Sequence, residues 1–207
     1  LPYIYKVEKL IVGGGVVSED LKEKLQEIPT EVYATYGMTE TITHIAVKKL
    51  NKLKTNENHF YKVLSNTTIY IDERNCLAID APKVSDEFVI TNDVVQLVSE
   101  NQFEWLGRYD NVINSGGIKL HPEKIEEKLS KIIKQRFFVI GIPDETLGEK
   151  MVLVIEGEKQ ESLLNAISSA VEISKYEIPK QVYFVSQFVE TETSKIQRTK
   201  TLRKVLL

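Results

Sequence analysis

The chain has 207 residues, of which 42% are hydrophobic and 28% charged, and its formal net charge is −3. These values are ordinary for a soluble globular protein and leave room for one domain or two small ones. The slightly acidic balance supplies no overall basic field, so we expect no nucleic-acid partner. No apolar run approaches the roughly 18 residues of a membrane-spanning helix, and we read no signal peptide.

Cys76 is the only cysteine. This excludes a disulfide within the chain and favours a reducing compartment, so we expect a cytoplasmic protein. We interpret His44 as a strand or turn histidine and not as a base. His59 and His121 have no Cys, Asp or Glu at metal-ligand spacing, and we predict no zinc site. The chain opens on Leu1 and reaches a strand-to-glycine turn almost at once, from which we expect a fragment whose N-terminal portion is missing.

The opening of the chain alternates strand, helix and strand, as α/β units do. Residues 9–12 form a short apolar run stopped by glycines, which is typical of a buried strand. Ser18 is the expected N-cap of a helix with Leu21 and Leu25 on one face, and residues 31–35 form the next strand.

From residue 43 the pattern changes to short β-rich runs separated by polar turns, which predicts a small antiparallel sheet or barrel. These runs are residues 43–47, 67–71, 76–79 and 94–98. Residues 51–58 are polar and are expected to form a loop.

Residues 107–117 contain three glycines and no long periodic segment, so the domain boundary is expected there. A helix with Pro122 in its first turn should follow. Beyond it we expect strands at 137–140, 151–155 and 182–185, and an amphipathic helix at 161–174 through Leu164, Ile167 and Val171.

The fold class is therefore α/β plus α+β. Residues 1–109 are expected to be the end of a large α/β domain with a small β-barrel. Residues 110–207 are expected to form a separate, mobile α+β domain.

Residues 36–41, with the sequence YGMTET, leave a strand and enter a turn. Gly37 lets the backbone approach a ligand closely, and Tyr36 offers a flat face to a purine. The Thr39 hydroxyl beside the Glu40 carboxylate suits a phosphate and its magnesium ion, because Mg²⁺ prefers hard oxygen ligands. The alternative is a surface turn with both side chains in water.

Two later motifs carry groups that suit a nucleotide. Asp93 stands at a strand end, where a carboxylate can accept both ribose hydroxyls. Arg108 has a fork of donors for the same sugar or for a phosphate. Asp110 lies at the domain boundary and could be a hinge. The alternatives are a turn-forming aspartate and a loop with one surface ion pair.

Two loops complete the set. Residues 114–117, NSGG, need close backbone approach or positive φ, which would suit a loop along a thin, extended substrate. A plain tight turn would use the same residues. Lys195 follows a polar loop and could be delivered to the charge that develops at a carboxylate and an α-phosphate. The alternative is a solvated lysine.

In this order, the motifs resemble the acyl-adenylate-forming superfamily of acyl-CoA synthetases, peptide-synthetase adenylation domains and luciferases. The resemblance spans essentially the whole chain. It is most specific over residues 107–117 and 122–126, and nearly as specific over residues 179–185 and 191–198. It implies the C-terminal half of an enzyme in which ATP activates a carboxylate. The amino-acid sequences of residues 33–41 and 114–117 are most similar to the motifs of the o-succinylbenzoate–CoA ligase subfamily of menaquinone biosynthesis. The family's Ser/Thr/Gly-rich phosphate loop is not present.

The resemblance also implies the ligands and the residue roles. ATP (released as AMP), Mg²⁺ and coenzyme A would be used with a small-molecule carboxylate. Catalysis would fall to Lys195, Thr39 and Glu40, with Glu40 also the metal ligand. The remaining roles would be Gly14 and Gly15 beside the adenine, Tyr36 stacked on it, Asp93 and Arg108 on the ribose, Lys119 on a phosphate, Asp110 as hinge, and Ser115, Gly116 and Gly117 beside the pantetheine tunnel.

The chain departs from the family pattern at several positions. Ser194 replaces the usual glycine before the lysine, and because serine is less permissive in backbone angle we expect a stiffer loop. Asn92 replaces another glycine, Lys119 stands where arginine is frequent, and Val16 stands where proline is common. The Gly-Glu-Ile and Gly-Tyr elements usual before the ribose aspartate are absent.

Two alternatives remain open. Another aryl or fatty acyl-CoA ligase, or an amino-acid adenylation domain, would share the chemistry and differ in the carboxylate pocket. A non-catalytic fragment would bind a nucleotide or a partner without turnover. In either case we expect the 207 residues alone to be inactive as an enzyme.

Overall fold

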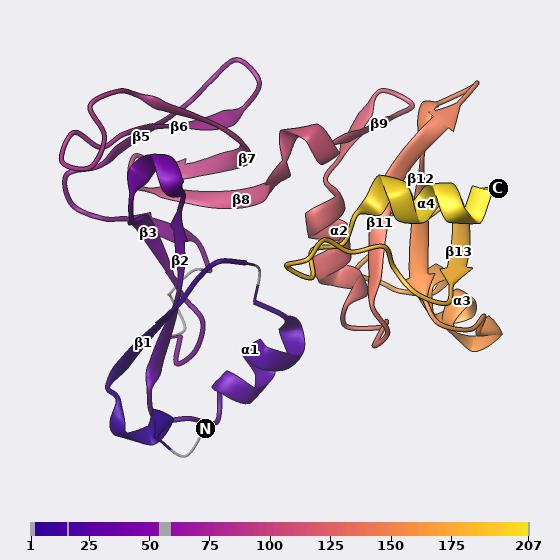
Figure 1. Ribbon diagram of the computed structural model, residues 1–207, viewed down its shortest axis with the longest axis horizontal. Helices are drawn as coiled ribbons and strands as arrows, with labels where there is room; N and C mark the ends of the chain where they lie inside the picture. Colours follow the sequence, from indigo (N-terminus) through magenta and orange to yellow (C-terminus); the bar gives the residue numbers. More distant parts are fainter. Residues whose placement is uncertain (1–2, 16, 54–58, 207) are drawn as a thin grey trace. The chain divides into compact units, whose positions relative to one another are not determined.

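The computed structural model describes residues 3–15, 17–53 and 59–206 (Figure 1). Val16 and positions 54–58 of the expected loop lie outside the described residues. The chain divides into two compact units, Leu1–Tyr109 and Asp110–Leu207. Each unit has hydrophobic clusters of its own.

The first unit begins with the expected strand, helix and strand. Ser18 caps the helix, accepting a hydrogen bond from the Leu21 amide at 3.3 Å. The elements are η1 (Ile4–Lys6), β1 (Lys9–Val12), α1 (Glu19–Leu25), β2 (Glu31–Gly37), η2 (Thr39–Thr41), β3 (His44–Lys49), β4 (Tyr61–Val63), β5 (Thr68–Ile71), β6 (Cys76–Asp80), β7 (Val89–Ser99) and β8 (Gln102–Arg108).

These strands form one sheet in the order β1-β2-β3-β4-β8-β7-β6-β5. Among the strand pairs described in this sheet, β1 and β2 alone are parallel, and the other pairs are antiparallel. The expected small β-barrel is therefore wrong, because the described strands form an open sheet. A barrel closes only when its edge strands pair, and here β2 and β3 join the antiparallel strands to β1 instead of closing them.

Strand β7 starts at Val89, earlier than the expected 94–98, and β4 and β8 were not anticipated. The segment before Val94 reads ITND, whose polar residues imitate a turn. Its pairing with β6 and β8 decides that it is a strand. Tertiary context overrides local β-propensity in this way.

Asn51 lies in the expected loop but is completely buried. Its side-chain oxygen accepts a hydrogen bond from the Val32 amide at 2.8 Å. Its side-chain nitrogen donates to the Leu25 and Thr30 carbonyls at 2.8 and 2.9 Å. Because a buried amide must be hydrogen-bonded, Asn51 joins the end of α1 to β2.

In its described residues, the second unit has a five-stranded sheet and three α-helices. The strand order is β10-β9-β12-β11, and β13 lies parallel to β12. The elements are η3 (Tyr109–Asn111), which crosses the boundary, β9 (Ile113–Ser115), β10 (Ile118–Leu120), α2 (Pro122–Leu129), β11 (Phe137–Asp144), β12 (Gly148–Glu156), α3 (Glu161–Ser168), β13 (Gln181–Val185) and α4 (Arg198–Leu206).

Helix α3 ends at Ser168, before the expected 174. Its core contacts come from Leu163 and Ile167, whereas Val171 is completely exposed. The Ser168 hydroxyl donates to the Leu164 carbonyl at 3.0 Å, and side chains that compete for backbone groups favour helix ends. No helix in the described part of the chain is long and apolar enough to cross a membrane.

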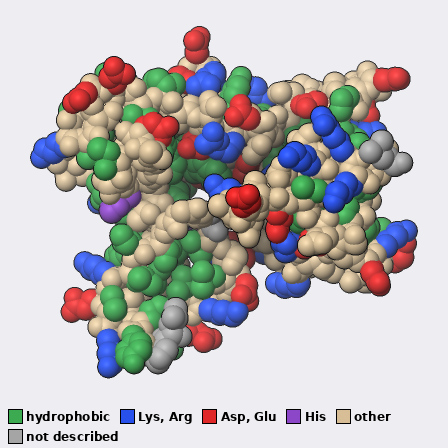
Figure 2. Space-filling view, viewed as in Figure 1, with side chains coloured by type: hydrophobic (Ala, Val, Ile, Leu, Met, Phe, Trp, Pro, Cys, Tyr) green, Lys and Arg blue, Asp and Glu red, His purple; other side chains and the backbone are tan. Residues whose placement is uncertain are grey.

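Large hydrophobic side chains are exposed near the start of the first unit. Tyr3, Tyr5, Val7 and Ile11 are all exposed. Figure 2 shows hydrophobic side chains gathered over the part of this unit that carries β1, β2 and α1. Exposed apolar surface of this kind marks a face suited to contact with another element or chain.

Candidate functional site

Asp93 is the centre of the candidate site in the first unit. It lies on β7 with a relative exposure of 7%. The Tyr36 hydroxyl donates to its Oδ2 at 2.7 Å, and the Trp105 indole donates to its Oδ1 at 3.1 Å. Arg108 lies 3.7 Å from Oδ1. Three neighbours therefore hold this carboxylate in one orientation.

Tyr36 contributes from the end of β2. Its ring packs edge-on against Phe103 and Tyr61, with centroids 5.2 and 5.7 Å away. Burial, and then the negative charge of Asp93, raise the pKa of its hydroxyl, which therefore stays protonated and donates. The sequence assigned Tyr36 a stacking role and did not foresee its bond to Asp93.

Tyr36→Phe removes this hydroxyl and keeps the ring. Hydrogen bonds to charged groups contribute about 1.5–3 kcal/mol, so we expect the free energy of unfolding of the first unit to fall by about 2 kcal/mol. Tyr70→Phe, at an exposed tyrosine of β5, is the matched control and should change it by less than about 0.5 kcal/mol. Urea unfolding measures both, and equal losses would contradict the role of the hydroxyl.

The Asp93 hollow is an open cavity of about 350 Å³ beside this carboxylate. Its polar lining brings together Glu40, Asp93 and Arg108, which come from separate motifs. Its lining residues are Gly37, Met38, Glu40, Val89, Ile90, Thr91, Asn92, Asp93 and Arg108. The hollow therefore combines acceptors for hydroxyl groups with one guanidinium for an anion.

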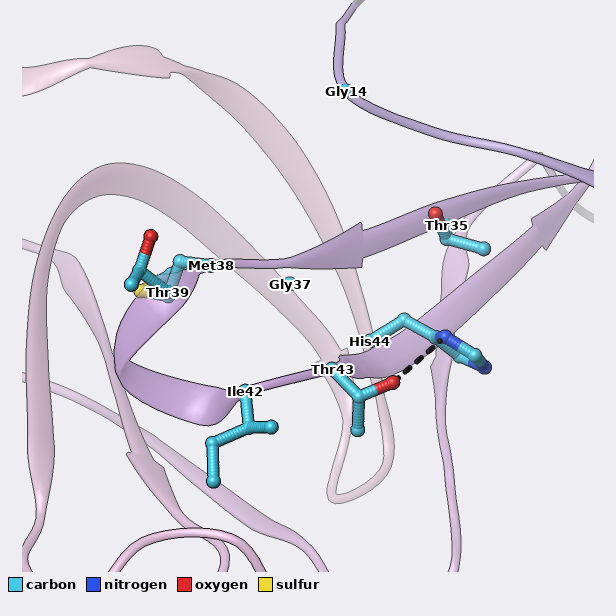
Figure 3. Close-up of a pocket in the computed structure, with 8 residues that line it drawn as sticks. All are labelled: Gly14, Thr35, Gly37, Met38, Thr39, Ile42, Thr43 and His44. Atoms are coloured by element: carbon cyan, nitrogen blue, oxygen red, sulfur yellow. Dashed lines mark hydrogen bonds between the residues drawn. The ribbon is translucent and has the colours of Figure 1, made fainter.

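The His44 hollow is a second, larger cavity of about 550 Å³. It shares Gly37 and Met38 with the Asp93 hollow. Gly14 enters from the turn after β1, while the other lining residues belong to β2, β3 and the turn that joins them (Figure 3). They are Thr35, Gly37, Met38, Thr39, Ile42, Thr43 and His44, and the Thr43 hydroxyl lies 3.3 Å from His44 Nδ1.

Thr41 fixes the turn between β2 and β3, and it is completely buried. Its hydroxyl oxygen accepts from the Met38 amide at 3.2 Å and lies 2.8 Å from the Thr43 carbonyl. Ile42 has φ 60° and ψ −40°, and the Thr43 amide donates to the Thr41 carbonyl at 2.5 Å. This is a γ-turn with positive φ, a strained form for a β-branched residue.

The expected residues of the second unit lie at its loops. Asp110 is in η3. Ser115 ends β9, and Gly116 and Gly117 form the turn to β10 with φ of 58° and 80°. Both glycines have positive φ, which is one of the two backbone requirements that the NSGG motif left open. Lys119 is exposed on β10.

Lys195 lies on a short hairpin formed by residues 188–198, which we call the lysine hairpin. An isolated bridge joins Glu190 to Ile196. The Thr191 amide donates to the Lys195 carbonyl at 2.9 Å, and the Lys195 amide donates to the Thr191 hydroxyl at 3.0 Å. The lysine is exposed at the tip of a hydrogen-bonded turn.

Ser194 adopts φ 59° in this turn. A non-glycine residue in this region is strained by about 1–2 kcal/mol, whereas glycine increases the entropy of the unfolded chain. We expect Ser194→Gly to leave the free energy of unfolding unchanged or raise it by up to about 1 kcal/mol.

Glu192→Gly is the control, since Glu192 has no positive φ. It should lower the free energy of unfolding by about 0.5–1 kcal/mol. Thermal unfolding of the second unit distinguishes the two variants. A larger loss for Ser194→Gly than for Glu192→Gly would contradict the strain at Ser194.

No protein-family model matches the chain. Over 220 residues it is 26% identical to the 2-succinylbenzoate–CoA ligase of Listeria monocytogenes, an alignment that covers 96% of the chain and 46% of that protein. It is 37% identical to an acyl-CoA synthetase (AMP-forming)/AMP-acid ligase II-like protein of Dyadobacter fermentans. That match covers 95% of the chain and 57% of the other, with a TM-score of 0.50.

The fold matches the o-succinylbenzoate CoA synthetase (MenE) of Bacillus subtilis, solved with the acyl-adenylate intermediate OSB-AMP. The TM-score is 0.79 at 21% identity, over 93% of the chain and 45% of that protein. The chain is homologous to the acyl-adenylate-forming ligases. It corresponds to the C-terminal part of their fold and spans about half the length of the relatives it matches.

The sequence did not predict the side chains that hydrogen-bond to Asp93 or to its strand in this homologue of the acyl-adenylate-forming ligases. Trp105 is the only tryptophan and precedes the GRYD motif, and this position was a usable signal. Arg74 gave none, because it lies in a polar turn. Its guanidinium donates to the Asn92 side chain at 2.8 Å and to the Thr91 carbonyl at 3.0 Å, which steadies the strand that carries Asp93.

Proposed function

We propose that the chain forms the C-terminal part of an ATP-dependent acid–CoA ligase whose acid is o-succinylbenzoate. The observation that carries the proposal is the Asp93 hollow, where Glu40, Asp93 and Arg108 line one cavity. The homology to 2-succinylbenzoate–CoA ligases supports the reaction and the acid.

The nucleotide would bind with its ribose at Asp93. The carboxylate is held by Tyr36 and Trp105, so its remaining lone pairs can accept the ribose hydroxyls. Arg108 would donate to the same sugar or to a phosphate. The Tyr36 ring, together with Gly14 and Gly15, would border the adenine.

The phosphates and magnesium would bind at Thr39 and Glu40. Both side chains are exposed beside the hollows, and Glu40 lines the Asp93 hollow. A single carboxylate is a suitable donor because Mg²⁺ usually takes one or two carboxylates together with substrate phosphates. When bound there, the metal ion would neutralise phosphate charge.

The acid would place its organic part in the His44 hollow. This cavity meets the Asp93 hollow at Gly37 and Met38, so a carboxylate there would lie toward the phosphates. Ile42 provides an apolar contact, and Thr43 and His44 provide polar groups for a substituent of the acid. A mixed apolar and polar lining is usual for pockets that bind small molecules.

The reaction would proceed in two steps. A carboxylate oxygen attacks the α-phosphorus and pyrophosphate leaves, with Lys195 and Thr39 stabilising the developing negative charge. The second unit then turns about Asp110, which removes Lys195 and presents Ser115, Gly116 and Gly117 to coenzyme A. Its sulfur attacks the acyl carbon and AMP leaves. Lys119 would contact a phosphate during one of these steps.

The partner of this chain would be the N-terminal portion of the same enzyme. The relatives extend well beyond the matched region. Tyr3, Tyr5 and Ile11 are exposed hydrophobic residues of the first unit, and such a portion would cover apolar surface of this kind. It would also complete the carboxylate pocket and supply the phosphate loop.

The test is ATP-dependent thioester formation by the full-length protein with o-succinylbenzoate, benzoate, a medium-chain fatty acid and several amino acids. Selective use of o-succinylbenzoate is the expected result. Use of another acid would support the proposed ligase reaction and contradict o-succinylbenzoate as the substrate. No activity on any acid, with nucleotide binding retained, would favour the non-catalytic alternative.

A further inference from the structure

Arg198 follows Lys195 by three residues. It is the last residue of the lysine hairpin and the first residue of α4. Its guanidinium forms an ion pair with Glu126 of α2, with Nη1 2.8 Å from Oε1. Nη2 donates to Glu126 Oε2 at 3.0 Å. The two side chains are only 26% and 19% exposed, so this pair is much less screened by solvent than a surface ion pair.

The Val139 peptide of β11 closes this arrangement into a ring. Its amide donates to Glu126 Oε1 at 2.7 Å, and its carbonyl accepts from Arg198 Nη1 at 3.0 Å. The Arg198 guanidinium also lies 5.8 Å from the centre of the Phe138 ring. Helix α2, strand β11 and the start of α4 are thus joined at one carboxylate.

The N-terminal leg of the hairpin has an ionic anchor as well. Glu190 pairs with Arg136, and Arg136 also pairs with Glu156 at 3.2 Å. The Phe188 amide donates to Glu156 Oε1 at 2.7 Å. Both legs are therefore tied to the sheet, while the turn that carries Lys195 stays exposed.

We propose that Glu126 is a positioning residue for Lys195, holding Arg198 so that the lysine hairpin keeps one orientation on the second unit. This inference rests on the proposed adenylation role of Lys195. Glu126 acts through Arg198 and touches no substrate. If Glu126 loses its charge, its ion pair with Arg198 is lost and the C-terminal leg of the hairpin is released. Lys195 would then be poorly oriented.

The titration of Glu126 should make the mobility of the lysine hairpin depend on pH. Burial raises the pKa of this carboxyl to about 7, against the opposing effect of Arg198. Among the described residues, charged groups near this pair include Glu123 on α2, and Asp110 and Glu149, which line a cavity together with Arg198. Lowering the pH through about 7 should therefore neutralise Glu126 and loosen the hairpin, whereas Glu126→Gln should remove this pH dependence.

Because the pKa of Glu126 is raised, an effect of this residue on the orientation of the hairpin can be distinguished from an effect on the stability of the fold. A carboxyl with a raised pKa stabilises the fold fully below its unfolded pKa, and that contribution is lost as pH rises through about 7. Glutamine resembles the neutral form, so Glu126→Gln should fold at pH 8 without loss of stability. A mobile hairpin in this variant would then reflect the lost ion pair.

Amide hydrogen exchange of the chain at pH 8 tests the inference. The amides of Thr191, Ser194 and Gln197 are bonded within the hairpin. We expect them to exchange at least about tenfold faster in Glu126→Gln, the effect of losing a hydrogen bond to a charged group. Glu177→Gln, which removes the Lys128–Glu177 pair of the same unit, should leave them unchanged.

Unchanged hairpin exchange in Glu126→Gln, or the same pH profile in Glu126→Gln and the unaltered chain, would overturn the inference. In the full-length protein, Glu126→Gln should slow pyrophosphate exchange about tenfold and spare thioester formation from a supplied acyl-adenylate. Lys195→Ala is assayed in parallel. If it leaves adenylation intact, the proposed role of Lys195 fails, whatever the exchange data show for Glu126.

Discussion

Lys195→Ala should slow adenylation by the full-length protein by about 10²–10³-fold, the effect of removing one donor to a developing charge. Thioester formation from a supplied acyl-adenylate should change by less than about threefold, because the second step does not use this amine. Lys195 is exposed at the tip of its hairpin, so the fold should be unaffected. Single-turnover assays of each half-reaction measure the two effects.

Lys200→Ala is the matched control for this variant. Lys200 is an exposed lysine on α4 of the same unit, and its removal changes the net charge equally. We expect both half-reactions to keep their rates in this variant. Equal losses in the two half-reactions for Lys195→Ala would reject its assignment to adenylation.

Gly37→Ala should lower the free energy of unfolding of the first unit by about 3 kcal/mol, near the upper end for overpacking. A Cβ at Gly37 would lie 2.6 Å from His44 Cα and 2.6 Å from the Thr43 carbonyl oxygen. These are backbone atoms, so no side-chain rotation relieves the contact. The strands would have to separate where β2 and β3 are already irregular.

Gly15→Ala is the control for this substitution. A Cβ at Gly15 meets nothing within 4 Å, and this residue has no positive φ. In Gly15→Ala, the free energy of unfolding of the first unit should change by less than about 1 kcal/mol. Urea unfolding of both variants is the measurement, and a Gly37→Ala variant as stable as Gly15→Ala would show that the strands can separate at little cost.

The same separation should affect both hollows, since Gly37 lines each of them. In the full-length protein, Gly37→Ala should therefore weaken binding of the nucleotide and of the acid together. This joint loss distinguishes it from changes at Asp93 or His44, each of which lines one hollow only.

Local chemistry in the sequence predicted several elements of the fold correctly. Ser18 indicated the start of α1 because its hydroxyl can accept a hydrogen bond from an unpaired amide of the first turn, and that bond is present. The apolar run at β1, stopped by glycines, identified a strand. Pro122 marked the first turn of α2. These signals depend on neighbours in the sequence, so they need no tertiary information.

Signals that depend on distant partners failed. The ITND segment of β7 looked like a turn because its strand character comes from β6 and β8. Val171 fitted a helical period but lies beyond the end of α3, fully exposed. Barrel closure was also undecidable, because it depends on whether edge strands meet and not on the pattern within any one strand.

By itself, the sequence determined the order of the motifs, the residue types at Thr39, Glu40, Asp93 and Arg108, and the glycines at positions that require positive φ. Only the tertiary structure decided which groups share a cavity and which neighbours orient them. The bonds from Tyr36 and Trp105 to Asp93, and from Glu126 to Arg198, join residues far apart in the chain. Spacing along the chain cannot predict such contacts, because strand register and helix packing set the distances between side chains.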